Sequence, residues 1–420
     1  MSDAALRAPT DWKGNAMQQR IRRRYAAERR FKLIGLAAVL LSAAFLAFLL
    51  FTMVSNGARG FTQAQVKVEI DFPGSALFLD PATLEGPSAE ATLATADIDA
   101  AVRTAAERQY GSGGGNLLAE GAWLRVREAI LEEPAILSRS QSFWLPASGN
   151  IDLAAKTDAA PEDERLYGQL QQRDAVRTAF NSHFLSSSDA TEPTSVGIWG
   201  AFKGSLLTML VTLALAFPIG VLSAIYLEEY APRNRWTDLI EVSINNLAAV
   251  PSIIFGLLGL AVFLNFMHLP RSAPLVGGIT LALMTMPVIV IAGRNAIKSV
   301  PPSIRDAALG VGASRVQVVF HHVLPLALPG ILTGTIIGMA RALGETAPLL
   351  MIGMRAFIAS PPGGITDPAT VLPVQIFLWS DEVSRGFVEK TSAAIIVLLV
   401  FLLAMNGLAI YLRNKFERRW

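Results

Sequence analysis

The strongest constraint on this chain is a set of six long apolar runs that carry very little charge. They cover residues 33–54, 204–227, 239–266, 275–291, 326–352 and 393–412. A helix of about 20 apolar residues crosses the roughly 30 Å hydrocarbon core of a bilayer. Hydrophobic residues make up 52% of the chain and charged residues only 17%, a balance typical of membrane proteins. The sequence therefore predicts a mainly α-helical protein with six transmembrane helices.

The runs are unevenly spaced, and their spacing predicts the domain organisation. The first run is too long for the apolar core of a signal peptide and has no small-residue cleavage pattern after Asn56, so we expect it to be retained. We predict a basic N-terminal stretch over 1–32, a first transmembrane helix over 33–57, an external insert over 58–198, a five-helix core over 199–413 and a tail over 414–420.

Basic residues around the spans predict the orientation of the chain. They precede the first span as Arg20, Arg22, Arg23, Arg24, Arg29, Arg30 and Lys32, follow the fourth as Arg294, Lys298, Arg305 and Arg315, and follow the last as Arg413, Lys415, Arg418 and Arg419. Cytoplasmic loops are enriched in Lys and Arg. Both termini are therefore predicted to be cytoplasmic. The insert, with 11 Arg and Lys against 20 Asp and Glu, is predicted to lie outside.

The insert has the pattern of a small α+β domain. Ala64, Val66, Val68 and Ile70 alternate with polar residues, as on a half-buried strand. Helical patterns follow over 97–109, 117–133 and 162–180, and the glycine run over 111–115 predicts a flexible turn.

The insert offers little for catalysis. It contains one histidine, His183, which we interpret as an ordinary surface residue beside Ser186, Ser187 and Ser188. The whole chain has no cysteine, which excludes disulfides and thiolate chemistry. No metal site or cofactor is expected in this chain, and a binding or scaffold role is favoured for the insert.

The segment over 299–325, between the fourth and fifth spans, is too long for a simple turn. Its marked positions are Asp306, Ala307, Ala308, Gly312, Leu324 and Pro325. They resemble the cytoplasmic coupling motif of ABC importer permeases, with Asp306 in place of Glu and His322 in place of Ile. The two alanines make a slim helix that can enter a partner's groove, Gly312 permits a sharp turn, and Pro325 suits the start of the next span.

The same segment has a simpler interpretation. An amphipathic helix at the membrane surface would carry Arg305 and Arg315 equally well, facing anionic headgroups. The chain lacks the G-x-x-x-x-G-K-[ST] phosphate loop, so we predict that it is not an enzyme and that a partner subunit hydrolyses ATP.

Arg341 and Glu345 are the charged pair inside the fifth span. An isolated charge at the bilayer centre costs about 2.5 to 3.5 kcal/mol, so neither side chain should face lipid. One interpretation is a structural ion pair between residues four apart, although placing the base before the acid opposes the helix dipole. The other places both residues, with Thr346, on the path of an anionic solute.

Asn245 and Asn246 are polar residues in the third span, shortly before a kink predicted at Pro251. They either line the path or form hydrogen bonds between helices. The sequence favours neither interpretation.

Three further motifs resemble the PstA-type phosphate permeases of the MetI-like superfamily. They are IYLEEYAP over 225–232, NNLAAVPSIIFGL over 245–257 and RALGETAPLL over 341–350. The last points to phosphate, whereas the coupling motif marks only the superfamily. The likeness covers residues 196–413, and the large insert resembles a longer variant of the family.

The resemblance implies a phosphate importer of the bacterial inner membrane. Its partners would be a PstC-type second permease, two copies of a PstB-type ATPase and a PstS-type phosphate-binding protein. Two rival hypotheses stay open: a permease for phosphonate, sulfate or molybdate, and a membrane-anchored external sensor or assembly protein.

Overall fold

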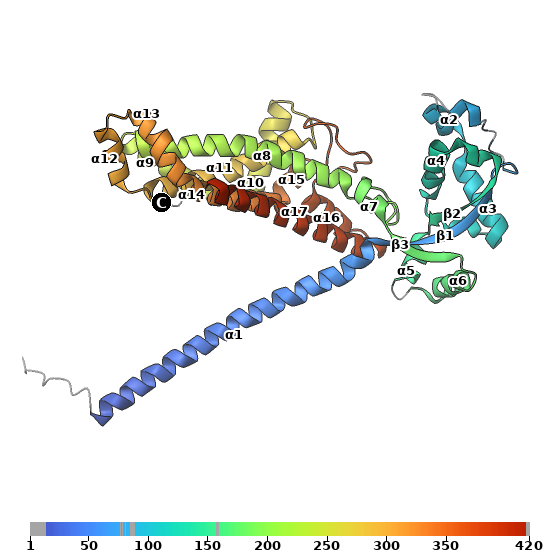
Figure 1. The fold of residues 1–420 in the computed structure, drawn as a ribbon, viewed down its shortest axis with the longest axis horizontal. Coiled ribbons are helices and arrows are strands. Elements are labelled where there is room, and N and C mark those ends of the chain that lie inside the picture. The colour runs from blue at the N-terminus through green and yellow to red at the C-terminus, as the bar shows by residue number, and fades with distance from the viewer. Residues whose placement is uncertain are drawn as a thin grey trace, which may run out of the picture. The chain divides into compact units, whose positions relative to one another are not determined.

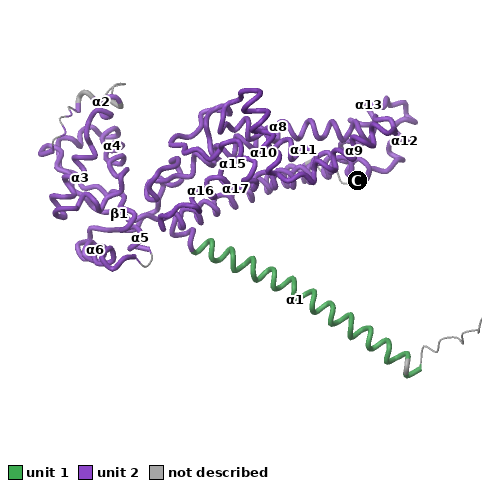
Figure 2. The backbone as a smooth tube through the Cα atoms, turned by 180° about the vertical axis from the view of Figure 1, so that it is seen from behind, with its two compact units in different colours: residues 1–55 green, residues 56–420 purple. Residues whose placement is uncertain are grey.

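The computed structural model describes residues 14–75, 77, 79, 81–84, 89–156 and 159–416. Arg418 and Arg419, the first thirteen residues of the predicted basic stretch and the end of the predicted tail lie outside these residues. The chain divides into two compact units, Met1–Ser55 and Asn56–Trp420 (Figure 2). The prediction of a mainly helical fold with a small sheet is confirmed (Figure 1).

Helix α1 (Asn15–Gly60) contains the first predicted span and begins well before it. The basic stretch is therefore helical too, with an ion pair of 2.6 Å between Lys32 Nζ and Glu28 Oε1. At 1.5 Å per residue, 46 residues extend about 69 Å, more than twice a hydrocarbon core. The basic part of the helix thus reaches well beyond the length needed to cross.

The insert is built on a three-stranded antiparallel sheet with the order β2-β1-β3. Its strands are β1 (Thr62–Asp71), β2 (Ser140–Pro146) and β3 (Val176–Phe180). The predicted alternation on β1 is confirmed, since Ala64, Val66, Val68 and Ile70 are all buried. They form one core with Val102 and Ala106 of α3 (Ile98–Tyr110) and with Val126 and Ile130 of α4 (Ala122–Glu132).

Smaller elements complete the insert. The helices are α2 (Ala89–Thr95), α5 (Gly149–Ala154), α6 (Pro161–Gln172) and α7 (Ser182–Ser186), and the 3₁₀ turns are η1 (Pro81–Leu84), η2 (Gly114–Leu117) and η3 (Pro134–Ser138). Gly111 and Gly113 have positive φ angles of 90° and 94°, so the glycine run makes a turn that other residues adopt poorly.

Two of the helices predicted in the insert have the wrong extent. The pattern over 162–180 is helical only in α6, because Asp174 turns the chain at φ 49° and residues 176–180 pair with β1 as β3. The pattern over 117–133 becomes helical at Ala122, because Leu118 forms a β-bridge with Ala147. Long-range pairing overrides the local helical pattern in both places.

The bundle is organised around two parallel helices, α8 (Trp199–Ile225) and α11 (Pro274–Lys298). Gly278 lies against Val211, and Gly220 against Ile289, so both helices run in the same direction. Helix α14 (Leu324–Leu343) packs antiparallel to α11, and α17 (Gly386–Phe416) packs on α14. Helix α8 ends in a π-helical turn, η4 (Tyr226–Tyr230).

The third predicted span is broken. Helix α9 (Arg235–Ala248) and the helical segment Ser252–Phe266, made of α10 (Ser252–Leu258) and the π-helical η5 (Gly259–Phe266), meet at 103°. The kink predicted at Pro251 is confirmed. Because α8 and α11 are parallel, the chain between them must return to the end where α8 began. The broken pair therefore makes one crossing, which gives six together with the five unbroken candidate spans.

The fifth predicted span is also wrong at its ends. The chain is helical from Arg315 through α13 (Arg315–Gln317), the π-helical η6 (Val318–Val323) and α14, and the helix stops at Leu343 with Gly344 as its cap. Residues up to 352 belong to a separate short helix, α15 (Ala347–Met351). Two further helices are α12 (Pro302–Gly310) and α16 (Leu372–Ser380).

Candidate functional site

The predicted coupling motif forms a helix and a tight turn at the end of the bundle where α8 and α11 finish. Asp306 and Ala307 of α12 are exposed, whereas Ala308 is buried in the core beneath the helix. Gly312 has a φ of +88°, a left-handed conformation that favours glycine. Ser314 then starts α13 through a capping box with Gln317.

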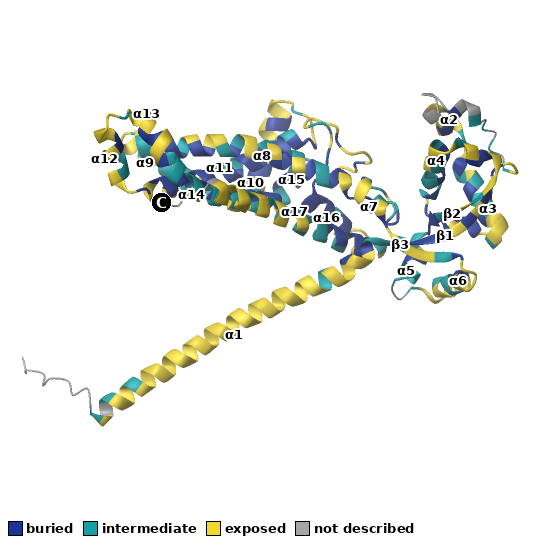
Figure 3. Ribbon diagram, viewed as in Figure 1, coloured by how far each residue is buried: buried dark blue, intermediate teal, exposed yellow. Residues whose placement is uncertain are grey.

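Much of the chain on both sides of this turn is exposed (Figure 3). Several of its exposed residues are apolar. We call this patch the coupling surface and define it by Ala307, Leu309, Val311, Val316 and Phe320. Val311 is 87% exposed, although valine is usually among the buried residues. Exposed apolar residues close in sequence to exposed charged residues, here Asp306 and Arg315, are typical of a protein interface.

Leu324 and Pro325 lie in the first turn of α14, but the chain is already helical before them. The π-helical turn η6 ends at Val323, two residues before Pro325, and π-turns commonly occur where the normal hydrogen-bond ladder is interrupted. Pro325 therefore does not open the helical segment, contrary to the expectation from its position. His322, which departs from the family pattern, is exposed, so no apolar contact is lost there.

Arg305 holds the coupling helix against the bundle. Its Nη2 donates to Glu229 Oε1 at 2.8 Å and to the carbonyl oxygen of Ile297 at 3.0 Å, and its Nη1 donates to the carbonyl oxygen of Val300 at 2.7 Å. The guanidinium thus faces protein, so the interpretation that Arg305 binds lipid headgroups is wrong. Only Arg315 retains an exposed position.

A second arginine extends this contact across three helices. Arg294 of α11 bonds Glu228 at 2.5 Å and Glu241 of α9 at 2.8 Å, and Lys298 lies 3.4 Å from Glu228. We call the set Glu228, Glu229, Glu241, Arg294 and Arg305 the coupling-end cluster. The sequence analysis did not predict this cluster. The available signal was a pair of adjacent glutamates at the end of one apolar run and basic residues at the end of another.

Arg341 and Glu345 are brought together, but only loosely. Arg341 Nε and Glu345 Oε1 are 3.5 Å apart, and the Arg341 side chain is 53% exposed in this chain. Because α14 ends at Leu343, Glu345 lies beyond the helix and Arg341 lies in its last turn. A cation is favoured at a helix C-terminus, so the objection that this pair opposes the helix dipole does not hold.

The other predicted path residues are placed separately. Thr346 precedes α15 and makes no side-chain cap. Asn245 and Asn246 are exposed near the end of α9, which packs on α11. Within the described ranges, no hydrogen bond joins either asparagine to Arg341 or Glu345.

The insert is joined to the bundle by buried charges. Lys156 Nζ lies 2.7 Å from Asp152 Oδ2 and 3.4 Å from Glu389 Oε2 of α17. Lys390 Nζ donates to the carbonyl oxygen of Gly60 at 2.9 Å, and Asp152 also accepts the backbone N–H of Ala64. We call Asp152, Lys156, Glu389 and Lys390 the junction cluster.

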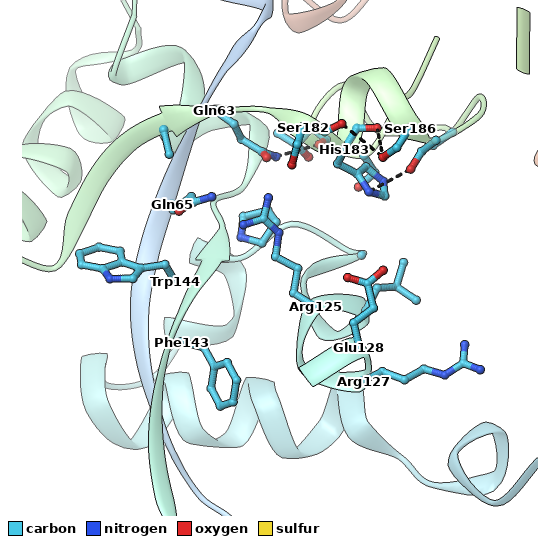
Figure 4. A pocket seen from close by; sticks show the side chains of 18 of the residues that line it. Gln63, Gln65, Arg125, Arg127, Glu128, Phe143, Trp144, Ser182, His183 and Ser186 are labelled. Carbon is cyan, nitrogen blue, oxygen red and sulfur yellow. Dashed lines mark hydrogen bonds between the residues drawn. The ribbon is translucent and has the colours of Figure 1, made fainter. Parts of the chain in front are cut away.

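A cleft of about 990 Å³ lies between the sheet, α4 and α7 (Figure 4). Its lining includes Arg125, Arg177 and His183. His183 is half-buried and its Nδ1 lies 2.9 Å from Ser187 Oγ, so its interpretation as an ordinary surface residue is wrong. Burial, together with the nearby Arg125, lowers the pKa of His183. Among the described residues there is no group of three His, Asp or Glu that could hold a metal ion.

Two family models match the chain in different parts. Residues 18–164 match a domain of unknown function (DUF3333), and residues 216–419 match the "Binding-protein-dependent transport system inner membrane component". The first match covers most of the insert. The second covers most of the bundle, with the coupling surface, the coupling-end cluster and Arg341.

Several bacterial proteins are similar to the chain. The probable ABC transporter permease protein YqgI of Bacillus subtilis is 30% identical over 252 residues, 55% of this chain and 84% of the relative. The phosphate transport system permease protein PstA of Yersinia pestis is 31% identical, covering 51% of this chain and 71% of the relative. PstA 1 of Mycobacterium tuberculosis H37Rv is 33% identical, covering 37% and 50%.

Solved structures are more distant. A bacterial alginate ABC transporter in complex with a pentasaccharide-bound periplasmic protein is 16% identical, covers 70% of this chain and 98% of that chain, and has a TM-score of 0.41. A likeness at that level carries no argument about function.

Proposed function

This chain belongs to the family of ABC importer permeases, as a member of the PstA type, and from this membership we propose that it forms part of the membrane path of a phosphate importer. The observation that carries the proposal is the coupling surface, an exposed apolar turn held to the bundle by Arg305. Relatives named as phosphate permeases support phosphate as the solute.

The coupling surface would receive an ATPase of the PstB type, of which an importer needs two copies. A PstC-type permease would complete the path, and a PstS-type protein would deliver phosphate outside. The predicted orientation, with both termini in the cytoplasm and the chain in the inner membrane, would place the coupling surface on the ATPase side.

The coupling-end cluster supports a mechanical role for the segment. Arg305 joins α12 to the end of α8 through Glu229 and to the end of α11 through two carbonyl groups. A displacement of α12 by closing ATPases would therefore move two bundle helices together. Alternating access needs such rigid-body movement of helices around the solute path.

Arg341 supports an anionic solute. Its guanidinium is exposed and only loosely paired, in a helix that otherwise has an apolar sequence. A charge in such a position is expensive in lipid, so it should face the partner permease or the path. A guanidinium fork matches the oxygen geometry of phosphate, and Glu345 would weaken binding enough to permit release.

Uptake by the reconstituted importer tests this proposal. The chain is expressed with its candidate partners, purified in mild detergent and reconstituted into liposomes. ATP is supplied on the side of the membrane that the ATPase subunits face. We expect labelled phosphate uptake that falls about tenfold or more in Arg341→Ala, the scale of one lost charged hydrogen bond. Uptake of phosphonate, sulfate or molybdate in place of phosphate would refute the assigned solute.

Arg355→Ala is the matched control, because Arg355 is an exposed arginine beyond α15. It should leave uptake unchanged. Unchanged uptake by Arg341→Ala in a fully assembled complex would remove Arg341 from the path.

A further inference from the structure

The insert contains a polar cleft that transport by the bundle does not explain. The sheet buries its apolar core on one face through Ala64 and Val66, so the neighbouring residues of β1 face the other side. On that side lie Gln63 and Gln65 of β1, Trp144 of β2 and Arg177 of β3, and all four line the cleft. Helices α4 and α7 supply the remaining walls (Figure 4).

Arg125 reaches into this cleft from α4 without a partner. It is half-buried, and it makes no hydrogen bond or ion pair within the part of the chain that the structure describes. Burial lowers the pKa of Arg125, Glu128 partly opposes this effect, and Arg177 adds to it. The environment therefore disfavours the charge of Arg125 unless an anion is present.

Arg177 is held in place on the opposite wall. Its guanidinium lies 4.4 Å from the centre of the Trp144 ring, and its Nε donates to Gln65 Oε1 at 3.0 Å. Stacking and one hydrogen bond fix the plane of the group, while its two terminal nitrogens have no partner among the described residues. A fixed fork with free donors is suited to bind oxyanions.

The wall also contains unsatisfied polar atoms. Gln63 is 1% exposed, and its Nε2 donates to the carbonyl oxygen of Thr194 at 2.8 Å, which fixes the orientation of the amide. Its Oε1, and the buried Oγ1 of Thr194, have no partner in the described residues. Buried polar groups are normally satisfied, so two such atoms in one wall indicate a missing ligand or water.

The acidic residues of the cleft do not neutralise its interior. Glu128 and Glu132 are exposed, where solvent screens their charge. Asp189 accepts a hydrogen bond from Nε1 of Trp379 at 3.0 Å and is directed to the bundle. Arg125 and Arg127 are half-buried, so solvent screens their charge less, while Arg177 is exposed at the opposite wall and held there by Trp144 and Gln65.

From these observations we propose that the cleft binds an oxyanion between Arg125 and Arg177, and that inorganic phosphate is its ligand. The cleft and its charge stand independently of transport, whereas the choice of phosphate rests on the proposed function. Ser188 packs against Gly200 of α8, and Asp189 contacts Trp379 of α16, so the site lies directly beside the start of α8 and the end of α16. Phosphate held there is stored next to the entrance of the bundle.

Equilibrium dialysis of labelled inorganic phosphate against the full chain in detergent tests the site. We expect saturable binding that weakens about tenfold or more in Arg125→Gln and in Arg177→Gln, since each removes a charged donor. Arg139→Gln is the matched control, because Arg139 is an exposed insert arginine outside the cleft. It should bind as the unaltered chain does.

Arg341→Ala distinguishes this site from the path. Binding that survives in Arg341→Ala and is lost in Arg125→Gln supports the cleft, even if the importer proves to carry another solute. Binding lost in Arg341→Ala but retained in Arg125→Gln would overturn the cleft and leave the proposed function intact. Absence of saturable binding to the unaltered chain would also overturn the cleft.

Discussion

The coupling-end cluster and the junction cluster hold an added element to opposite ends of the same bundle, and they do so differently. The coupling-end cluster uses arginines that bridge carboxylates at helix ends, next to an exposed surface. The junction cluster uses lysines that are almost completely buried, with Lys390 also lying 5.2 Å from the centre of the Phe184 ring. At the coupling end Arg294 and Glu228 are also largely buried, and the difference lies in Arg305 and Glu241, whose side chains are 22% and 40% exposed.

This difference teaches what each connection can do. Breaking a buried pair leaves an uncompensated charge and is strongly destabilising, so the junction should behave as a fixed anchor. The pairs made by Arg305 and Glu241 are partly exposed and lose less when they are rearranged, because water can replace a partner. Contacts of Arg305 and Glu241 at the coupling end should therefore rearrange at a lower cost in free energy than those of the junction.

Asp152→Ala should have the largest effect, because it removes the nearer partner of buried Lys156 and the acceptor for the N–H of Ala64. We expect the free energy of unfolding of the insert to fall by about 3 to 5 kcal/mol. Chemical denaturation followed by limited proteolysis of the insert measures it. Asp99→Ala breaks a more exposed pair with Arg103 and should cost less than about 1 kcal/mol. Equal losses of unfolding free energy in Asp152→Ala and Asp99→Ala would contradict the difference between buried and exposed pairs.

Arg305→Ala should come next, because it releases α12 from α8 and α11. We expect uptake to fall about tenfold or more while the ATPase still binds, since the apolar coupling surface is retained. Uptake and co-purification, measured together, separate these effects. Arg305→Lys keeps the charge but loses the fork, so it should recover only part of the uptake. Full uptake by Arg305→Ala would show that the cluster transmits nothing.

Gly312→Ala sharpens the comparison at the coupling surface itself. Alanine at a φ of +88° is strained by about 1 to 2 kcal/mol, so the turn should be less populated and ATPase binding weaker by roughly five- to thirtyfold. Titration of the reconstituted chain with the ATPase measures the affinity. Gly310→Ala has the same chemistry in a helical residue with open space around it and should not weaken binding. Matching losses in both variants would contradict a role for the left-handed turn.

A pH change should have the smallest effect and is confined to the insert. The pKa of His183 is lowered in the folded chain by burial and by Arg125, so the unfolded chain binds more protons below the ordinary pKa of 6.5. Stability of the insert should therefore fall as the pH decreases through that value. Denaturation at pH 7.5 and 5.5 checks this, and His183→Gln should remove part of the difference. His268→Gln, which alters a histidine of the bundle, should leave the stability difference between the two pH values unchanged.

The spans and the coupling motif could be predicted because they depend on local composition. Apolar runs of sufficient length have few alternatives to helices in a bilayer, and the alternation on β1 places Ala64 and Val66 on one face whatever surrounds them. Gly312 was identified as a turn residue for the same reason. Its conformation is a property of one residue.

Several of the predictions that proved wrong depend on distant partners. Residues 176–180 form a strand because β1 offers them hydrogen bonds, and Arg305 is turned from the membrane surface by Glu229, a residue of another helix. His183 lines a cleft to which residues of α4, well before it in the chain, also contribute. None of these contacts produces a periodic pattern in the sequence from which it could be predicted.

The sequence by itself determined the membrane spans and the turn at Gly312, because membrane solvation and backbone geometry act residue by residue, while the permease class rested on a resemblance of its motifs. Only the tertiary structure decided where the charged groups lie: buried at the junction, buried to partly exposed at the coupling end, and along the wall of the insert cleft. Electrostatic energies depend on distance and solvent exposure between residues remote in the chain, and those quantities exist only after folding.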